Sequence, residues 1–348
     1  MIGLTGVAQE LGKRNISAWS VFAYSDPNWV VETRGGMVDR SIDYETLLTM
    51  NDAARAAEPA FRAHWVQNGD WENLSWSKME HFGALLELGL SEWKDRQSEE
   101  GVSIVPEGFS EKLVTEVIVL NRMYRDEFRE GIGDEVAWFG DFLGEMPAVP
   151  GISEETVQGQ AIPRFLIARP LESREKITAA GESLSASNRR VLKWLSESIV
   201  IEISAVMPQS IESGGVMTWF APLPFIGGDF VPGVSIDDRV WMIGTSRSLA
   251  EGFSKSMVTV GSAGETGVIF EVDLERLVSW SEEIRVANEE TIDSLTDELL
   301  KETEVPEGFG SSEGLIEGLK KLKRFSYRSW LEGGKPRSRY KLEFKSSE

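Results

Sequence analysis

The pattern of hydrophobic and polar residues gives its densest strand signal in one stretch of the chain, Gly214–Phe253. Within it the pattern predicts an apolar strand at Val216–Ala221, a connection rich in proline and glycine, and a second strand at Arg239–Ile243. A turn at 244–246 then opens a helix. We expect the flanking strands and helices to cover this stretch.

The two ends of the chain repeat one plan, a helix followed by a β-hairpin. The opening hairpin pairs strands predicted at Ile16–Tyr24 and Trp29–Thr33, and the closing hairpin pairs Phe325–Leu331 with Arg339–Phe344. The pentapeptide Val-Pro-Glu-Gly-Phe also occurs twice, at 105–109 and 305–309. We interpret these echoes as the tail of one repeat followed by a complete unit, which predicts a chain cut from a longer precursor.

The segment 41–147 is predicted to be mainly helical. Asp43 is expected to cap a helix through Leu47, Leu48 and Ala54, Ser77 begins a second helix, and Ser110 caps a third that stops at Gly131. The pattern at Glu135–Leu143 fits a strand or a helix, and the sequence does not decide between them. The proline- and glycine-rich stretch Met146–Gly151 is the best boundary in the chain.

Strands and helices intermix after this boundary. Strands are predicted at 162–168, 199–206 and 268–272, and helices at 172–184, from Ser187 and from the cap Asp273. We therefore predict an α+β fold: a mostly antiparallel twisted sheet with hairpins, covered by helices, plus a largely helical segment in the N-terminal half. The predicted parts are 1–40, 41–147 and 148–348, with packing as one unit left open.

Charge narrows the range of partners. The chain has 57 acidic and 36 basic residues, a net charge of −21, which disfavours nucleic acid and anionic membranes. The absence of cysteine excludes disulfides and thiolate metal sites. No run approaches the roughly 20 apolar residues of a membrane span. The first residues lack the plan of a signal peptide, so the protein is either cytoplasmic or cut from a longer precursor.

The turn Gly244–Ser248 resembles a nucleophile elbow, because a strand enters it and a helix leaves. An elbow requires Gly-x-Ser-x-Gly, and Ser248 occupies the place of the second glycine. The histidines available as a base are His64 and His81. The competing interpretation, which we favour, is that Thr245 or Ser246 caps the helix.

Three other patterns are weaker. The glycine-rich loop 261–267 precedes a strand and contains Glu265, so we favour a hairpin loop over a phosphate site. The Ser-x-x-Lys pattern at 173–176 lacks the companion motifs of penicillin-recognising enzymes. The two histidines do not have the spacing of a helical metal site.

Tryptophan is abundant, with 12 residues. Exposed tryptophans can stack on sugars, and the competing interpretation is that they pack in the core. A glycosidase would also need two convergent carboxylates, which the sequence does not single out. The tryptophans that crowd the segment predicted to be helical are Trp65, Trp71, Trp76 and Trp93.

Several motifs together resemble a group of exported bacterial envelope proteins of unknown function, over roughly residues 111 to 345. They are Gly133–Ala137, Pro163–Ala168, Val240–Ser246, Phe270–Leu274 and the closing hairpin. The resemblance implies a large twisted sheet carrying helices, an envelope location and a non-enzymatic role. It transfers no functional residues.

Taken together, the sequence predicts a non-catalytic exported protein that serves as a binding or assembly module for a protein or glycan. The alternative is a carbohydrate-binding or carbohydrate-active protein, and a weaker third hypothesis is a serine hydrolase at Ser246. We assign no catalytic, cofactor-binding or metal-binding residues and expect no cofactor. The oligomeric state is left open, and the location is periplasmic or otherwise exported, with the cytoplasm as alternative.

Overall fold

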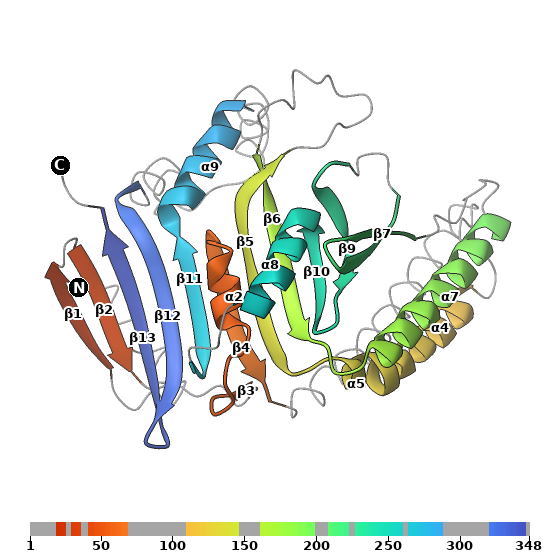
Figure 1. Ribbon diagram of the computed structural model, residues 1–348, viewed down its shortest axis with the longest axis horizontal. Helices are drawn as coiled ribbons and strands as arrows, with labels where there is room; N and C mark the ends of the chain where they lie inside the picture. The colour runs from red at the N-terminus through yellow and green to blue at the C-terminus, as the bar shows by residue number, and fades with distance from the viewer. Residues whose placement is uncertain are drawn as a thin grey trace, which may run out of the picture.

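A computed structural model describes residues 19–25, 29–35, 41–68, 109–145, 161–198, 208–222, 227–259, 264–287 and 320–345. These residues form a single sheet of thirteen strands (Figure 1). The strands are β1 (Trp19–Ser25), β2 (Trp29–Gly35), β3 (Ile42–Asp43), β4 (Phe61–Gln67), β5 (Glu135–Glu145), β6 (Ala161–Pro170), β7 (Gln209–Ser213), β8 (Val216–Phe220), β9 (Phe230–Ile236), β10 (Val240–Ser246), β11 (Val268–Asp273), β12 (Leu322–Glu332) and β13 (Lys335–Phe344).

The helical elements of the described residues lie on the sheet or at one end of it (Figure 1). They are α2 (Asn51–Ala56), α4 (Phe109–Met123), the π-helical turn η1 (Tyr124–Phe128), α5 (Arg129–Gly131), α7 (Arg174–Ser198), α8 (Arg247–Thr259) and α9 (Leu274–Ala287).

Every strand pair within the described residues is antiparallel. The order across the sheet is β1-β2-β13-β12-β11-β4-β5-β6-β10-β9-β8-β7, with β3 beside β4. The opening and closing hairpins therefore lie next to each other, joined by the pairing of β2 with β13 (Figure 1). Strands from the start, middle and end of the sequence alternate in this order, so the sheet crosses all three predicted parts.

The main core lies between the central strands and the two helices α2 and α8. Phe139 of β5 and Phe253 of α8 are fully buried and their ring centroids are 5.1 Å apart. Figure 1 shows both helices in front of the central strands. We call this side of the sheet the helix-covered face. The other buried members of this core are Met50, Ala53, Ala54, Ala137, Leu166, Ala168, Val216, Val240, Met242, Leu249 and Ala250.

A smaller core joins the helices at one end of the molecule to the opposite face of the sheet. Ile132 and Ile177 pack with Trp241 of β10 and Ile236 of β9, and Phe128 meets the Trp241 ring edge-on at 5.1 Å. This contact positions α7 and the adjacent α4, which run side by side in Figure 1.

The predicted fold class is wrong. The protein is mostly one large antiparallel sheet, and it is not a helix-covered α+β fold with a helical N-terminal half. Strands β4 and β5 lie inside the segment 41–147 that we predicted to be mainly helical. The physical reason is that Arg62, His64, Glu135 and Asp141 are buried polar residues within these strands. In β4 apolar and polar residues do alternate over 61–65, but the polar members Arg62 and His64 are buried, which is the reverse of a strand with one polar, solvent-exposed face.

Two predicted helix starts are also wrong. Asp43 ends β3, and its carboxylate accepts hydrogen bonds from the backbone N–H groups of Glu45 and Thr46 at 2.8 and 3.1 Å, so it closes a turn instead of a helix. Ser187 starts no helix, because α7 runs through it without a break. Its hydroxyl donates a 2.6 Å hydrogen bond to Glu116 of α4.

Other local predictions are confirmed. The closing hairpin forms β12 and β13, with Gly333 and Gly334 at positive φ in the turn. Asp273 caps α9 through the backbone N–H of Arg276 at 3.1 Å. The helix predicted before the opening hairpin, the helix predicted from Ser77, the strand at 199–206 and both pentapeptides, apart from Phe109, fall outside the described residues.

One glycine of β5 tests the packing of the sheet. A Cβ on Gly140 would lie 2.1 Å from the carbonyl oxygen of Arg164 and 2.6 Å from the Phe61 ring. We expect Gly140→Ala to lower the free energy of unfolding by about 1–3 kcal/mol, because the backbones must separate. Gly181 of α7 is the control: a Cβ added there would meet no neighbouring atom within 4 Å, so Gly181→Ala should stabilise the helix by about 1 kcal/mol. Urea unfolding measures both, and equal effects of the two changes would contradict the close approach.

Candidate functional site

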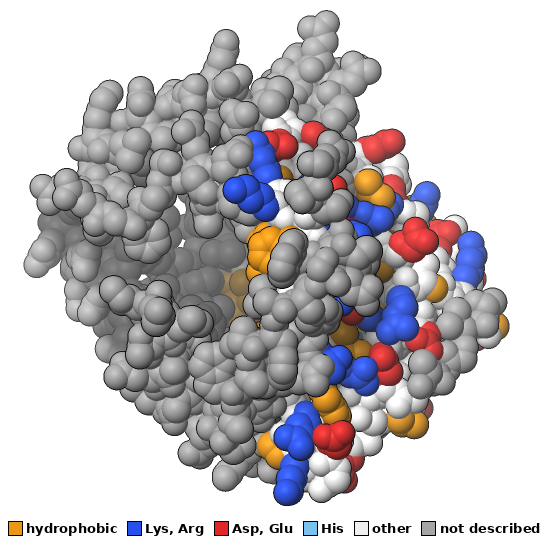
Figure 2. Space-filling view, turned by 90° about the vertical axis from the view of Figure 1, so that its left-hand side faces the viewer, with side chains coloured by type: hydrophobic (Ala, Val, Ile, Leu, Met, Phe, Trp, Pro, Cys, Tyr) orange, Lys and Arg blue, Asp and Glu red, His pale blue; other side chains and the backbone are white. Residues whose placement is uncertain are grey.

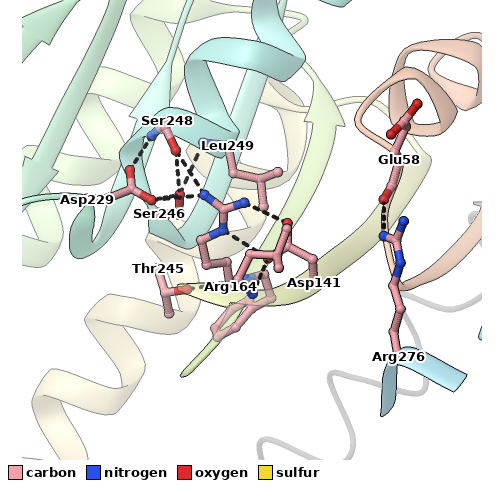
Figure 3. A network of polar contacts seen from close by, with 11 residues as sticks. Glu58, Asp141, Arg164, Asp229, Thr245, Ser246, Ser248, Leu249 and Arg276 are labelled. Carbon is pink, nitrogen blue, oxygen red and sulfur yellow. Dashed lines mark hydrogen bonds and ion pairs between the residues drawn. The ribbon is translucent and has the colours of Figure 1, made fainter. Parts of the chain in front are cut away.

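The bend between β10 and α8 contains the serine that the sequence singled out. Ser246 ends β10, and only 4% of its surface is exposed. Its hydroxyl donates a 2.6 Å hydrogen bond to Oδ2 of Asp229, which precedes β9. The hydroxyl also accepts a 3.1 Å hydrogen bond from the backbone N–H of Leu249 (Figure 3). Ser246 is therefore the N-cap of α8, as the favoured interpretation predicted.

Asp229 completes the cap. Its Oδ1 accepts the backbone N–H of Ser248 at 2.7 Å, and its backbone carbonyl accepts that of Arg247 at 3.1 Å. The first three N–H groups of α8 are thus all bonded within the protein. Free N–H groups at a helix start are what would bind an anionic ligand or an oxyanion, and here they have partners already.

Arg164 of β6 ties this cap to the neighbouring strand. Its guanidinium makes a two-pronged contact with Asp141 of β5, at 2.9 and 2.7 Å, and it also donates to Asp229 at 3.3 Å and to the Ser248 hydroxyl at 3.2 Å. Thr245 turns the other way and accepts the backbone N–H of Phe165 at 3.2 Å (Figure 3). One cation therefore bridges two carboxylates.

The surroundings of Asp229 make it a weak base. Burial acts to raise the pKa of its carboxyl, but hydrogen bonds from Ser246, Ser248 and Arg164 outweigh burial and hold the pKa below its ordinary value. Contact with Asp141, ahead of its contact with Asp229, raises the pKa of Arg164. A carboxylate of lowered pKa does not take a proton from a serine hydroxyl near neutral pH.

The histidine that could have served as a base lies elsewhere. His64 is on β4, separated from β10 by β5 and β6, which is about 14 Å at the usual strand spacing. It is 1% exposed, and its Nε2 lies 2.7 Å from Oε1 of Glu135. His81 falls outside the described residues. Among the described residues, the strand, turn and helix of a nucleophile elbow are therefore present without a histidine beside Ser246.

His64 belongs to a second buried polar cluster. Glu135 of β5 accepts hydrogen bonds from the backbone N–H of Met50 at 2.8 Å and from the Thr49 hydroxyl as well as contacting His64. Burial would raise the pKa of Glu135, and the hydrogen bonds from His64, Met50 and Thr49 overcome burial and lower it. The cluster fixes the segment before α2 onto the sheet.

Arg62, two residues before His64, also attaches the start of α2 to the sheet. It donates to Glu271 of β11 at 2.9 Å and to the Asn51 side chain at 2.6 Å. Sequence reasoning missed Asp229, Arg164, Arg62 and Glu135. For Arg164 and Arg62, a lone charge inside an otherwise apolar strand is the signal that could have been used, because such a residue is stable when an opposite charge lies on a neighbouring strand.

The remaining sequence candidates have structural roles. Ser173 accepts the backbone N–H of Lys176 at 3.3 Å at the start of α7, and Lys176 pairs with Glu130. The part of the loop 261–267 that is described, Gly264–Gly267, holds Glu265, which pairs with Arg55 and Arg328 at 3.3 Å each. Ser173 and Lys176 cap a helix and form an ion pair, and Glu265 forms ion pairs. These contacts argue against the Ser-x-x-Lys and phosphate-loop hypotheses.

Two tryptophans lie on the face of the sheet opposite α2 and α8. Trp138 of β5 and Trp219 of β8 are 38% and 36% exposed, and Ile243 between them is 38% exposed. Register partners link them in one transverse row: Trp138 with Ile167, Ile167 with Ile243, Ile243 with Val234, and Val234 with Trp219. Trp65 is partly buried on β4, and Trp71, Trp76 and Trp93 lie outside the described residues.

Among the described residues, no group of three or more His, Asp or Glu side chains is arranged to hold a metal ion. No described helix is long and apolar enough to cross a membrane. Comparisons of the chain with protein families, curated proteins and solved structures found no match.

The lowered pKa of Asp229 predicts a pH dependence of stability. Because the folded pKa lies below the unfolded value, the carboxylate contributes stability above the unfolded pKa of about 3.9, and this contribution disappears as the pH falls through the folded pKa. Asp229→Asn should lower stability at neutral pH and weaken the loss of stability on acidification. The exposed Asp238→Asn is the control. Denaturant unfolding from pH 7 down to pH 3 measures this, and identical pH profiles for Asp229→Asn and the parent would contradict it.

Proposed function

We propose that this protein is a non-catalytic, exported binding or assembly module. One observation supports the non-catalytic part most directly: the hydroxyl of Ser246 donates a hydrogen bond to Asp229 and accepts one from the backbone N–H of Leu249. A nucleophile needs access to the substrate and a neighbour whose pKa suits proton removal. Ser246 is buried, and hydrogen bonds hold the pKa of its neighbour Asp229 below the ordinary value.

The other reactive residue types among the described residues support the same proposal. Arg164 and Arg62 are bound to carboxylates on adjacent strands, and His64 is buried against Glu135. Groups held this way stabilise one arrangement of strands and are costly to disturb. The exported location is supported by the resemblance to envelope proteins and by the acidic composition.

The replacement Ser246→Ala tests this function. We expect it to lower the free energy of unfolding by about 1 kcal/mol, as for loss of an N-cap, and to leave ester hydrolysis at the background rate of the parent. Ser210→Ala, at an exposed position of β7, is the control for stability. Labelling of the parent by a fluorophosphonate probe that disappears in Ser246→Ala would disprove the non-catalytic proposal.

The row between Trp138 and Trp219 supports a second candidate function, carbohydrate binding. Four strand spacings separate the two rings, about 19 Å, and the aliphatic side chains between them form a platform. Aromatic rings exposed on such a surface stack on the apolar faces of sugar rings. The ligand would be an extended neutral polysaccharide spanning several strands.

Co-sedimentation with cellulose, chitin and a soluble β-glucan tests the second candidate. We expect Trp138→Ala and Trp219→Ala each to weaken binding about tenfold or more, because each ring supplies a separate stacking contact. Trp194→Ala, on α7, should leave binding unchanged. Absence of binding by the parent to any of the three polysaccharides would contradict this candidate function and leave the non-catalytic proposal standing.

A further inference from the structure

Charged side chains at the hairpin end of the molecule are mixed, with Lys and Arg beside Asp and Glu over the described surface (Figure 2). A charge that is buried without a close counter-charge is a stronger sign of a ligand, because burying it is costly. The arginines of the helix-covered face are not in this situation, since carboxylate oxygens lie 2.9 Å from Arg62 and 2.7 Å from Arg164. Arg169, on the opposite face of the sheet, is.

Arg169 lies near the end of β6, where the sheet meets the helices. It is directly opposite Trp241 of β10, and residues that are directly opposite in an antiparallel pair project from the same face. Trp241 packs with Ile177 and Phe128 of the helical end, so Arg169 lies beside this contact. Its side chain is only 12% exposed.

The guanidinium of Arg169 has few partners. Its Nε donates a 2.9 Å hydrogen bond to the backbone carbonyl of Gly133. Oδ1 of Asp134 is 3.9 Å from its Nη2, which is too far for a hydrogen bond. The same oxygen lies 2.6 Å from Nη2 of Arg129. Nη1 and Nη2 of Arg169 therefore donate no hydrogen bond to any residue that the structure describes.

Two cations thus share one carboxylate. Burial lowers the pKa of the Arg169 guanidinium below its ordinary value, and the neighbouring Arg129 lowers it further. Tyr124 and Asp134 act to raise this pKa, but they do not outweigh burial. The positive charge of Arg169 is therefore incompletely balanced where it lies.

Other acidic groups at this end of the molecule do not supply the missing charge. Glu172 lies beside Gly133, but it forms no ion pair with Arg169. Glu127 of η1 and Glu130 of α5 are bonded to Ser183 and Lys176 of α7. Among the described residues, Arg169 is left with no carboxylate at hydrogen-bond distance.

An uncharged apolar row begins two residues from Arg169. Ile167, on the same strand and the same face, is directly opposite both Trp138 of β5 and Ile243 of β10. Trp138 and Ile243 are each 38% exposed. Within the paired register, this face of β4, β5, β6, β9 and β10 carries no Asp, Glu or Lys. A poorly balanced cation and an exposed apolar row therefore lie about 6.6–6.8 Å apart along one strand.

We propose that Arg169 and this row bind a fatty acid, with the carboxylate on Arg169 and the aliphatic chain along Ile167 and Ile243. Nη1 and Nη2 offer two donors to the two oxygens of a carboxylate. The row offers apolar side chains without charge, which suit CH₂ groups. A monocarboxylate also supplies the single negative charge that Arg169 lacks. This inference rests on the proposed binding function and gives its ligand a chemical class.

Three ligands test the proposal by isothermal titration calorimetry, each below its micelle-forming concentration. Dodecanoate has both parts of the ligand, dodecyltrimethylammonium has the same chain with the opposite charge, and butanoate has the same head with a short chain. We expect dodecanoate to bind about tenfold or more tightly than either of the others. The net charge of −21 by itself favours the cationic ligand, so preference for the anion requires a local cation. Tighter or equal binding of dodecyltrimethylammonium, or no binding of dodecanoate, would overturn the proposal.

Single replacements locate the head and the chain. Arg169→Gln should weaken dodecanoate binding about tenfold, because the charged contact is lost. Arg174→Gln removes the same charge from a side chain that is 54% exposed at the start of α7, and it should have no effect. Ile243→Ser should also weaken binding, whereas Val258→Ser, at a 69% exposed position of α8, should not. Equal effects of the two arginine replacements would contradict the assignment of the head.

Stability separates a ligand site from a structural ion pair. Removal of a buried charge that lacks a close counter-charge relieves a cost, so Arg169→Gln should not lower the urea midpoint of unfolding. Arg62→Gln breaks a close pair with Glu271 and should lower it. A fall in Arg169→Gln as large as in Arg62→Gln, or failure of Arg169→Gln to fold, would give Arg169 a structural role and overturn the proposal.

Trp219→Ala distinguishes the fatty acid from the polysaccharide of the second candidate function. Trp219 is on β8, three strand spacings or about 14 Å from β6, so its loss should weaken polysaccharide binding and leave dodecanoate binding unchanged. Weakening of dodecanoate binding as large as in Ile243→Ser would contradict the proposed path of the chain. A failed fatty-acid experiment leaves the non-catalytic assignment of Ser246 intact, because the fluorophosphonate test decides that separately.

Discussion

Hydrogen bonding between strands that are far apart in the sequence is the interaction on which the rest of the structure depends. β2 pairs with β13, and β4 pairs with both β5 and β11, so the central strands exist only when distant segments have met. Non-local pairing of this kind has a high cost in loop-closure entropy before any contact stabilises it. The sheet then sets the positions of the other elements, including helix α8 and the closing hairpin.

Buried charges on the helix-covered face make this pairing specific. Arg164 meets Asp141 on the next strand, Arg62 meets Glu271, and His64 is hydrogen-bonded to Glu135. An unpaired buried charge is strongly unfavourable, so a shift of register would separate each pair and expose a large energetic cost. The same residues attach α2 and α8 to the sheet through Met50, Asn51 and Asp229. In this protein, residue types that often carry out catalysis hold strands and helices together.

Charged residues are arranged differently in the central strands and in the closing hairpin. The central strands balance their charges in pairs on the covered face, where Arg62, His64, Glu135 and Asp141 are buried. The closing hairpin lies beyond the reach of α2 and α8, and its charges are set at the surface with a positive excess. Surface ion pairs are weak contributors to stability, so the hairpin can carry this excess at little cost to the fold.

The sequence by itself determined the local elements whose signals lie within a few residues. The glycine turn between β12 and β13, the cap at Asp273 and the hydroxyl cap at the start of α8 follow from short-range chemistry, and all three are present. The general architecture and strands β4 and β9 did not follow, nor did the partners of Ser246. A sheet is assembled from pairings between distant segments, and a polar residue such as Arg62 or Asp141 is compatible with a strand only when its partner is across the ladder. Only the tertiary structure supplies that partner, because the information lies in which strands are neighbours and not in any one stretch of the chain.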